Sequence, residues 1–188
     1  MRKLLLLCMS GVLLSATCLA NSAKEQALAP GIKYRVGVGS RVTQNYSVLT
    51  ESLDFGIGYR PDGQNVFGVV GQICQDAVQV TQGARRTLDT TFNLLVSYTH
   101  DFSPSFRSFY MGCNVGTVDV FGSRPGVHAG IEPGYRFLIG GRVPTRLGLL
   151  MDYERRGTVP WGPSAENDMP AAVSKGVSIV GLMIRVEL

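Results

Sequence analysis

A histidine and a glutamate four positions apart are the residues of this chain best suited to catalysis. Together with a serine, His128 and Glu132 could hydrolyse an ester, because a histidine base oriented by a carboxylate activates a hydroxyl for nucleophilic attack. Both residues fall on the polar side of a segment, 127–137, in which apolar and polar side chains alternate. We interpret them as a polar pair on the inner face of a strand, and we predict no catalytic residue and no cofactor.

The cysteines do not form a metal-binding pattern. Cys8 and Cys18 lie within the first twenty residues, and Cys74 and Cys113 lack the CxxC or Cys/His spacing of a zinc site. We therefore predict no metal. Cys74 and Cys113 fall on non-adjacent strands and on different faces of the pattern described below, which argues against a disulfide between them.

Charged residues form two groups that differ in their position along the chain. The first group alternates with apolar residues and is nearly balanced in sign, as a network of buried ion pairs must be. These predicted interior residues are Lys33, Arg35, Asp54, Arg60, Arg107, Glu132, Arg136, Arg146, Asp152, Glu154, Arg185 and Glu187. The second group is basic and lies where alternating segments meet long connections, so its members could bind phosphate. These predicted rim residues are Arg41, Arg85, Arg86, Arg124, Arg155, Arg156 and Lys175.

The elements that must position these side chains are β-strands. Eight segments alternate apolar and polar residues with a period of two, which is typical of strands whose two faces meet different surroundings. No stretch of comparable length has the helical period. The segments are 31–40, 51–60, 66–73, 88–99, 108–116, 127–137, 146–154 and 181–188.

The connections between these segments alternate in length. The short ones carry Pro, Gly, Asp or Ser, which turns require, and the long ones are polar. Short turns at one end and longer connections at the other are typical of an up-and-down barrel in the outer membrane, with the short turns on the periplasmic side. The short connections are 61–65, 100–105 and 140–144, and the long ones are 41–50, 74–87, 117–126 and 155–175.

The chemistry of the two faces favours lipid outside the barrel. The polar face is rich in Gly, Ser, Asn and Thr, which suit the narrow interior of an eight-stranded barrel. Pro133 lacks a backbone donor, so we expect a bulge or a missing hydrogen bond there. Aromatic residues on the apolar face lie near the predicted periplasmic ends, where an interfacial girdle belongs. They are Tyr34, Tyr59, Phe67, Tyr98, Phe109, Tyr135 and Phe137.

Composition and the N-terminus agree with this interpretation. The chain has 188 residues, 45% hydrophobic and 17% charged, which excludes a disordered protein, and no apolar run after residue 20 could form a membrane-spanning helix. Residues 1–20 resemble a secretory signal, with Arg2 and Lys3 before an apolar stretch and cleavage before Asn21. We predict a signal peptide over 1–20, a short periplasmic segment over 21–30 and a barrel over 31–188. Removal of the signal leaves 16 of the 18 basic residues against 14 acidic ones, so no nucleic-acid partner is expected.

The sequence resembles the small eight-stranded outer-membrane barrels of the OmpA transmembrane domain, OmpX/Ail and opacity-protein type. The signal, the alternating segments, the stretch 130–137 and the C-terminal alternation carry the likeness. It implies an all-β, eight-stranded, antiparallel, up-and-down transmembrane barrel in the Gram-negative outer membrane. Members of this group end in an aromatic residue that the barrel-assembly machinery reads, whereas this chain ends in Leu188.

This resemblance predicts a non-enzymatic barrel with a filled interior. Its rim arginines would contact lipopolysaccharide phosphates, and its surface loops would serve envelope integrity or bind a surface or host protein. Trp161, in the longest connection, could anchor such a partner or pack on the barrel rim.

Three alternatives stay open. Lipid A deacylases are small barrels, but they carry a His-x-Ser pattern where this chain has His128-Ala129-Gly130. A small porin would conduct ions. A soluble periplasmic ligand-binding barrel would not fractionate with the outer membrane.

Overall fold

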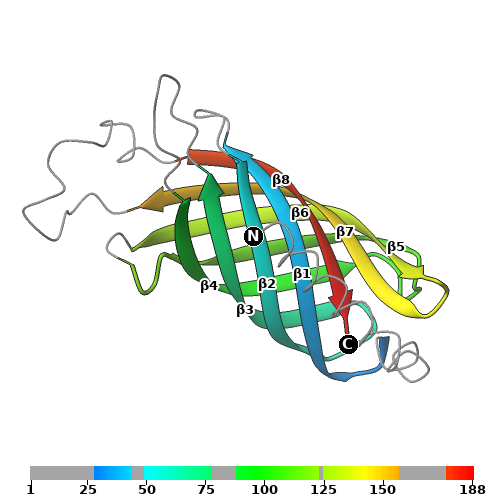
Figure 1. The fold of residues 1–188 in the computed structure, drawn as a ribbon. Helices are drawn as coiled ribbons and strands as arrows, with labels where there is room; N and C mark the ends of the chain where they lie inside the picture. The colour runs from blue at the N-terminus through cyan, green and yellow to red at the C-terminus, as the bar shows by residue number, and fades with distance from the viewer. Residues whose placement is uncertain (1–27, 44–48, 78–87, 123–124, 157–176) are drawn as a thin grey trace, which may run out of the picture.

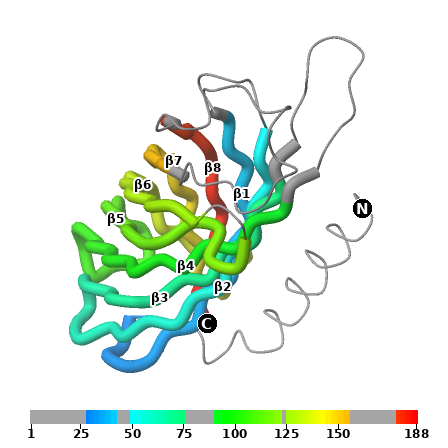
Figure 2. The backbone as a smooth tube through the Cα atoms, turned by 90° about the vertical axis from the view of Figure 1, so that its left-hand side faces the viewer, coloured from blue at the N-terminus to red at the C-terminus, as the bar shows by residue number. Residues whose placement is uncertain are grey.

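Eight antiparallel strands, joined in chain order, close into a single barrel in a computed structural model that describes residues 28–43, 49–77, 88–122, 125–156 and 177–188. Each strand pairs with the next, and the last lies beside the first (Figures 1 and 2). The predicted fold class is therefore confirmed. The strands are β1 (Gly31–Thr43), β2 (Leu49–Arg60), β3 (Asn65–Ala77), β4 (Leu88–Asp101), β5 (Ser108–Val118), β6 (Gly126–Ile139), β7 (Val143–Arg156) and β8 (Val177–Glu187).

Every predicted segment is a strand, and most strands are longer than the sequence pattern predicts. β3 continues to Ala77 and β7 starts at Val143, so the connections are shorter than expected. Backbone pairing continues beyond the alternation, for example between Val42 and Leu49, because ladder hydrogen bonds do not depend on side-chain type.

The register of the barrel tilts its strands. One row of cross-strand partners starts at Thr91 on β4, passes through every strand and returns to β4 at Asp101, ten residues further along. With about 3.3 Å per residue and about 4.8 Å between strands, this displacement corresponds to a tilt of about 40°. The row is Thr91, Cys74, Ser52, Gly39, Met183, Gly148, Gly134, Tyr110 and Asp101.

The outer face of the wall is apolar. Phe109 is 68% exposed, Val96 61% and Ile32 60%, and many other large apolar side chains also point outward. An exposed apolar surface of this extent belongs in lipid, since soluble proteins expose contiguous apolar patches of at most a few hundred Å². No helix in the described part of the chain is long and apolar enough to cross a bilayer.

The aromatic residues expected at the periplasmic boundary gather at the short-turn end of the wall. The Phe67 and Tyr98 rings lie 4.9 Å apart, and the Phe109 and Tyr135 rings 5.1 Å apart. On strands tilted by about 40°, the seven predicted girdle residues span only about 10 Å along the barrel axis. They form a narrow belt, as interfacial aromatic residues do.

Pro133 interrupts the ladder between β6 and β7. Partner pairs run as far as Ile131 with Met151 and resume at Gly134 with Gly148 in the same register. The interruption is a missing hydrogen bond rather than a bulge, which is one of the two outcomes that the sequence predicts. Its cause is that proline has no N–H to donate.

Candidate functional site

The inward faces of the strands carry the chemistry of this protein, as three groups of buried polar side chains. We name them by their position along the barrel. The short-turn cluster comprises Lys33, Arg60, Asp101, Arg136, Arg146 and Glu187; the central cluster Arg35, Asp54, Tyr110, Glu132 and Arg185; and the long-connection cluster Arg41, Gln72, Cys74, Asn114, His128, Asp152 and Glu154.

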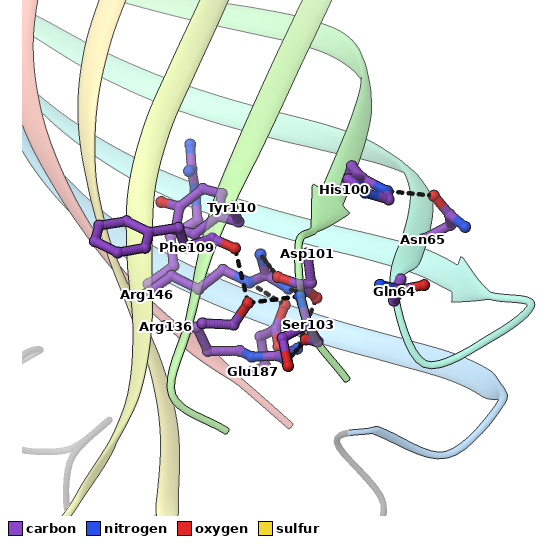
Figure 3. A network of polar contacts seen from close by, with 12 residues as sticks. Gln64, Asn65, His100, Asp101, Ser103, Phe109, Tyr110, Arg136, Arg146 and Glu187 are labelled. Carbon is purple, nitrogen blue, oxygen red and sulfur yellow. Dashed lines mark hydrogen bonds and ion pairs between the residues drawn. The ribbon is translucent and has the colours of Figure 1, made fainter. Parts of the chain in front are cut away.

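Asp101 is the centre of the short-turn cluster (Figure 3). Its Oδ2 lies 3.2 Å from Arg60 Nη1 and 2.6 Å from Arg136 Nη1, and its Oδ1 lies 2.8 Å from Arg146 Nη1. Arg146 Nε also donates to Glu187 Oε1 at 2.6 Å. The Asp101 carboxylate is 0% exposed, so these guanidinium groups replace the water that it loses.

Two of these arginines also hold the short turns over the end of the barrel. Arg60 Nη1 donates to the Gly63 carbonyl at 2.9 Å. Arg136 Nη2 donates to the carbonyls of Ser103 and Ser105. Side chains from the wall thus satisfy carbonyls that would otherwise face the barrel mouth, and they order the turns 61–64 and 102–107.

The central cluster joins opposite walls of the barrel. Arg185 on β8 forms ion pairs with Glu132 on β6 and, at 3.0 Å, with Asp54 on β2. The Tyr110 hydroxyl donates to Glu132 Oε1 at 2.6 Å. The Arg146 guanidinium lies 4.7 Å from the centre of the Tyr110 ring, a cation–π contact that connects this cluster to the short-turn cluster.

Glycines on β6 and β7 leave the space that the central cluster occupies. A Cβ at Gly134 would lie 2.5 Å from the Tyr110 hydroxyl, and a Cβ at Gly148 would overlap the Glu132 carboxylate and also lie 2.5 Å from that hydroxyl. Small residues on the inner face therefore accommodate the large polar side chains of neighbouring strands, as expected for a narrow barrel.

Arg41 organises the long-connection cluster. Its Nη1 lies 3.2 Å from Asp152 Oδ2, and its Nη2 donates to Gln72 Oε1 at 2.7 Å and contacts Cys74 Sγ at 2.6 Å. His128 Nδ1 lies 3.1 Å from Glu154 Oε1. The cluster thus combines one guanidinium, two carboxylates, an imidazole and a thiol close to the end of the barrel opposite the short turns.

Two sequence predictions about arginines are wrong. Arg41 was expected on the rim, but it is 1% exposed and points inward, because β1 extends to Thr43 and its alternation continues through this position. Arg107 was expected inside, but it lies in the turn that precedes β5 and not on a strand, and its carbonyl accepts a hydrogen bond from Ser105. The remaining predicted interior residues do point into the barrel, with Arg35 half-buried and the others buried.

The most connected interior residue, Asp101, was missed by the sequence prediction. It was placed in a short connection, whereas β4 includes it. The signal was present in the sequence, since the inward series of Asn93, Ser97 and Thr99 leads to position 101.

Few of the predicted rim residues can be placed. Arg155 is exposed on β7, and Arg156 is the last residue of that strand. Arg85, Arg86, Arg124, Lys175 and Trp161 lie outside the described residues. Cys74 faces the interior and Cys113 the outside, so the wall separates the two thiols.

Two small cavities lie among the side chains of the described interior. A cavity of about 20 Å³ lies between the central and long-connection clusters, and another of about 10 Å³ lies beside Lys33 and Glu187. The Arg35 side chain packs against Gly56, and its Nη2 donates a hydrogen bond to Ser97 Oγ at 2.5 Å. Arg35 lines both cavities. Each cavity has room for about one or two water molecules. No cluster of side chains that could hold a metal ion occurs among the described residues.

Comparisons with known proteins reveal similarity at the level of fold. No family model and no curated protein matches the sequence. Among solved structures, Neisserial surface protein A (NspA) aligns with a TM-score of 0.52 and 17% identity, over 84% of this chain and 96% of that chain. The chain has the fold of a small outer-membrane β-barrel. The outer membrane enzyme PagL aligns with a TM-score of 0.48 and 11% identity, over 82% of this chain and 98% of that chain, which is too weak a likeness to bear on activity.

The two ends of the barrel differ in their connections. The short-turn cluster lies at the end with the short turns, at the level of the aromatic residues of the outer face. The long-connection cluster lies at the opposite end, where Arg155 is exposed near the end of β7.

Proposed function

We propose that this protein is a non-enzymatic, non-conducting barrel of the Gram-negative outer membrane that supports surface loops. The observation that carries the proposal is the filled interior. Three clusters connect the walls along the barrel, and two cavities among them measure about 20 Å³ and 10 Å³. A cross-linked barrel of this kind is a rigid support for its connections.

The placement of the histidines supports a non-enzymatic role. His128 is 2% exposed and lies between Glu154 and Asn114, where a lipid substrate could not reach it. His100, the other histidine, contacts the side-chain oxygen of Asn65 rather than a carboxylate. A lipid A deacylase would need its histidine and its acid on the lipid side of the wall.

We propose that the basic rim contacts lipopolysaccharide through Arg155 and Arg156. Arg155 is exposed at the outer-side end of β7, next to the half-exposed ring of Tyr153. This height suits a guanidinium that pairs with phosphate above the acyl chains. Arg85, Arg86, Arg124 and Lys175 would extend the same rim, and Trp161 would take part in contact with a surface or host protein.

Export and assembly would follow the route of other barrels of this fold. The first twenty residues would direct secretion and be removed, and the barrel-assembly machinery would recognise the C-terminal strand. β8 closes the barrel against β1, and backbone hydrogen bonds of 3.0 and 2.8 Å join Leu188 to Tyr34.

Conductance and fractionation test the proposal together. The full chain should appear in outer-membrane fractions, migrate faster on gels before boiling than after it, and give no stable conductance in planar bilayers. Discrete channels in the bilayer would favour the porin alternative. Lipid A with fewer acyl chains in cells that express the protein would favour the deacylase alternative.

The lipopolysaccharide contact has its own test. Lipopolysaccharide should raise the unfolding temperature of the wild-type protein in micelles, and a double substitution of Arg155 and Arg156 to Gln should reduce that rise. An Arg107→Gln variant is the matched control, since Arg107 lies in a turn at the opposite end. An unchanged rise in the double variant would refute the contact.

A further inference from the structure

The apolar outer wall of the barrel continues into the turn that follows β5, at the end opposite the short turns. Phe121, in this turn, is 84% exposed, more than any other large apolar side chain among the described residues. Its ring lies 5.2 Å from the ring of Phe92, measured between their centres. Phe92 lies on β4 in one outward series with Leu94 and Val96, so Phe121 extends the wall beyond the last residue of β5.

Hydrogen bonds hold this turn, residues 119–122, against β4. The Val120 N–H donates to the Phe92 carbonyl at 2.9 Å, and the Asp119 N–H donates to Asn93 Oδ1 at 3.1 Å. The N–H of residue 122 donates to the Asp119 carbonyl at 3.0 Å. Asp119 has a φ of 55°, in the left-handed region that aspartate tolerates better than most residues, at the point where β5 ends. The turn therefore has a fixed position on the wall.

The wall beneath the two rings is also apolar. Ile73 on β3 is the cross-strand partner of Phe92 and is exposed. Gly71, two residues away on the same strand, lies beside the Phe92 ring, since a Cβ at Gly71 would be 3.2 Å from Phe92 Cζ. The Phe92 ring thus occupies the space that a side chain at Gly71 would take, and it supports the Phe121 ring from below.

The position of Phe92 along the barrel corresponds to a boundary of the apolar wall. Phe92 precedes Asp101, the last residue of β4, by nine residues. With about 3.3 Å per residue and a tilt of about 40°, this separation is about 23 Å along the barrel axis, close to the band of about 25 Å that outer-membrane barrels expose to lipid. By the same geometry, the half-exposed Tyr153 on β7 lies within about 2 Å of the height of Phe92, and Arg155 lies about 4 Å further out.

We propose that the turn 119–122 is a membrane anchor, in which Phe121 and Phe92 contact lipid acyl chains just below the headgroups. Isolated apolar side chains on a protein surface are common, but Phe121 continues a contiguous apolar wall and stands where aromatic rings favour the interface. The partner of this turn is therefore lipid, and the turn is not a free surface loop. The inference rests on the proposed placement in a membrane but not on the proposed contact with lipopolysaccharide.

Depth-dependent fluorescence quenching tests the anchor in the full-length mature barrel, refolded in phosphatidylcholine vesicles. Trp161, the only tryptophan of the chain, is replaced by Phe, and single tryptophans are introduced as Phe121→Trp, Val96→Trp and Ser105→Trp. Val96 is exposed about halfway along the apolar wall, whereas Ser105 is exposed in a turn over the barrel mouth. Lipids with bromine near the headgroup end or near the middle of the acyl chains serve as quenchers.

The anchor predicts that bromine near the headgroup end quenches Phe121→Trp several-fold more than Ser105→Trp, and that bromine in the middle of the chains quenches Val96→Trp most. Quenching of Phe121→Trp no greater than that of Ser105→Trp would overturn the anchor. Blue-shifted emission that bromine does not quench would overturn it in favour of a protein contact. If Val96→Trp also escapes quenching, the barrel is not in the bilayer, and the proposed function fails together with the anchor.

A second substitution tests the support that Phe92 gives to the turn. Phe92→Ala, added to Phe121→Trp, removes the ring that holds the side chain at position 121 on the wall, so most of the quenching should be lost. Phe102→Ala is the matched control, because Phe102 is also an exposed ring but lies at the short-turn end, and it should leave the quenching unchanged. Equal quenching with and without the Phe92 ring would overturn the role assigned to Phe92.

Discussion

Replacement of Asp101 by Asn should destabilise the barrel more than any other single change of one carboxyl group to an amide. The variant keeps the size and shape of the side chain but removes the negative charge that Arg60, Arg136 and Arg146 share. The two turns held by Arg60 and Arg136 should loosen along with the cluster.

The expected loss in the free energy of unfolding follows from the burial of the ion pairs that Asp101 forms. Removal of one partner from a buried ion pair costs about 3–5 kcal/mol, because the other charge stays buried without compensation. The amide oxygen introduced by the substitution can still accept one or two hydrogen bonds, each worth about 1 kcal/mol, which keeps the estimate within that range. A loss of about 3–5 kcal/mol in the free energy of unfolding is therefore expected for Asp101→Asn.

Urea unfolding in lipid vesicles measures this loss, with the folded fraction taken from the heat-modifiable band on gels. Asp62→Asn is the control at the same end of the barrel. Asp62 is exposed, and the amide oxygen can still accept the hydrogen bonds from the backbone N–H groups of Gln64 and Asn65, so the loss of stability should stay below about 1 kcal/mol. Arg136→Met in the Asp101→Asn background should cost less than in the wild type, since it removes a charge that has lost its partner. The reasoning would be refuted by an Asp101→Asn variant as stable as the control.

Three further predictions concern other parts of the structure. Gly148→Ala should destabilise the barrel by about 1–3 kcal/mol in the same urea assay, because its methyl group overlaps Glu132 and Tyr110. Gly112→Ala is the control and should cost less, since a Cβ at Gly112 would meet its neighbours at ordinary contact distances of 3.4–3.8 Å. Hydrogen bonds from the Asn65 side chain and from the backbone N–H groups of Gln64 and Asn65 lower the pKa of Asp62. These hydrogen bonds stabilise the turn fully at a pH above the pKa that Asp62 has in the unfolded chain, and the stabilisation is lost as the pH falls through its lowered pKa in the folded chain. In an NMR titration of the carboxyl group, Asn65→Ala should raise the pKa of Asp62. An unchanged pKa would contradict the role of the Asn65 side chain. In micelles, N-ethylmaleimide, which partitions into detergent, should react with Cys113 on the outer face of the folded barrel before it reacts with the buried Cys74, and mass spectrometry of peptides would reveal any early reaction at Cys74.

The fold and the direction of most interior side chains could be predicted because the side-chain period of a strand is two. A residue such as Arg136 or Glu132, flanked by apolar neighbours, has one possible face once the strand is recognised, and both point inward. The same period placed Phe109 and Tyr135 outside, where their rings meet. Closure into eight strands followed from the number of segments and from the alternation of their connections.

The ends of the strands could not be predicted in the same way. Arg41, Asp101 and Arg107 were all misplaced at a boundary between a strand and a connection. A strand continues as far as its neighbour offers backbone partners, so its last residue depends on the adjacent strand rather than on the local pattern. The sequence pattern ends the first strand at residue 40, whereas β1 continues to Thr43, and this difference changes the position of Arg41 from the rim to the interior.

The amino-acid sequence by itself determined that this chain forms strands with one apolar and one polar face, and that charge of both signs lies on the polar face. Only the tertiary structure decided which charges meet. Arg185 and Asp54 are 131 residues apart, and Arg146 and Asp101 are 45 apart. Their contacts depend on the ten-residue displacement that accumulates around the closed barrel. That displacement is a property of all eight strands together, because each register is set by pairing with two neighbours and by the closure of the ring.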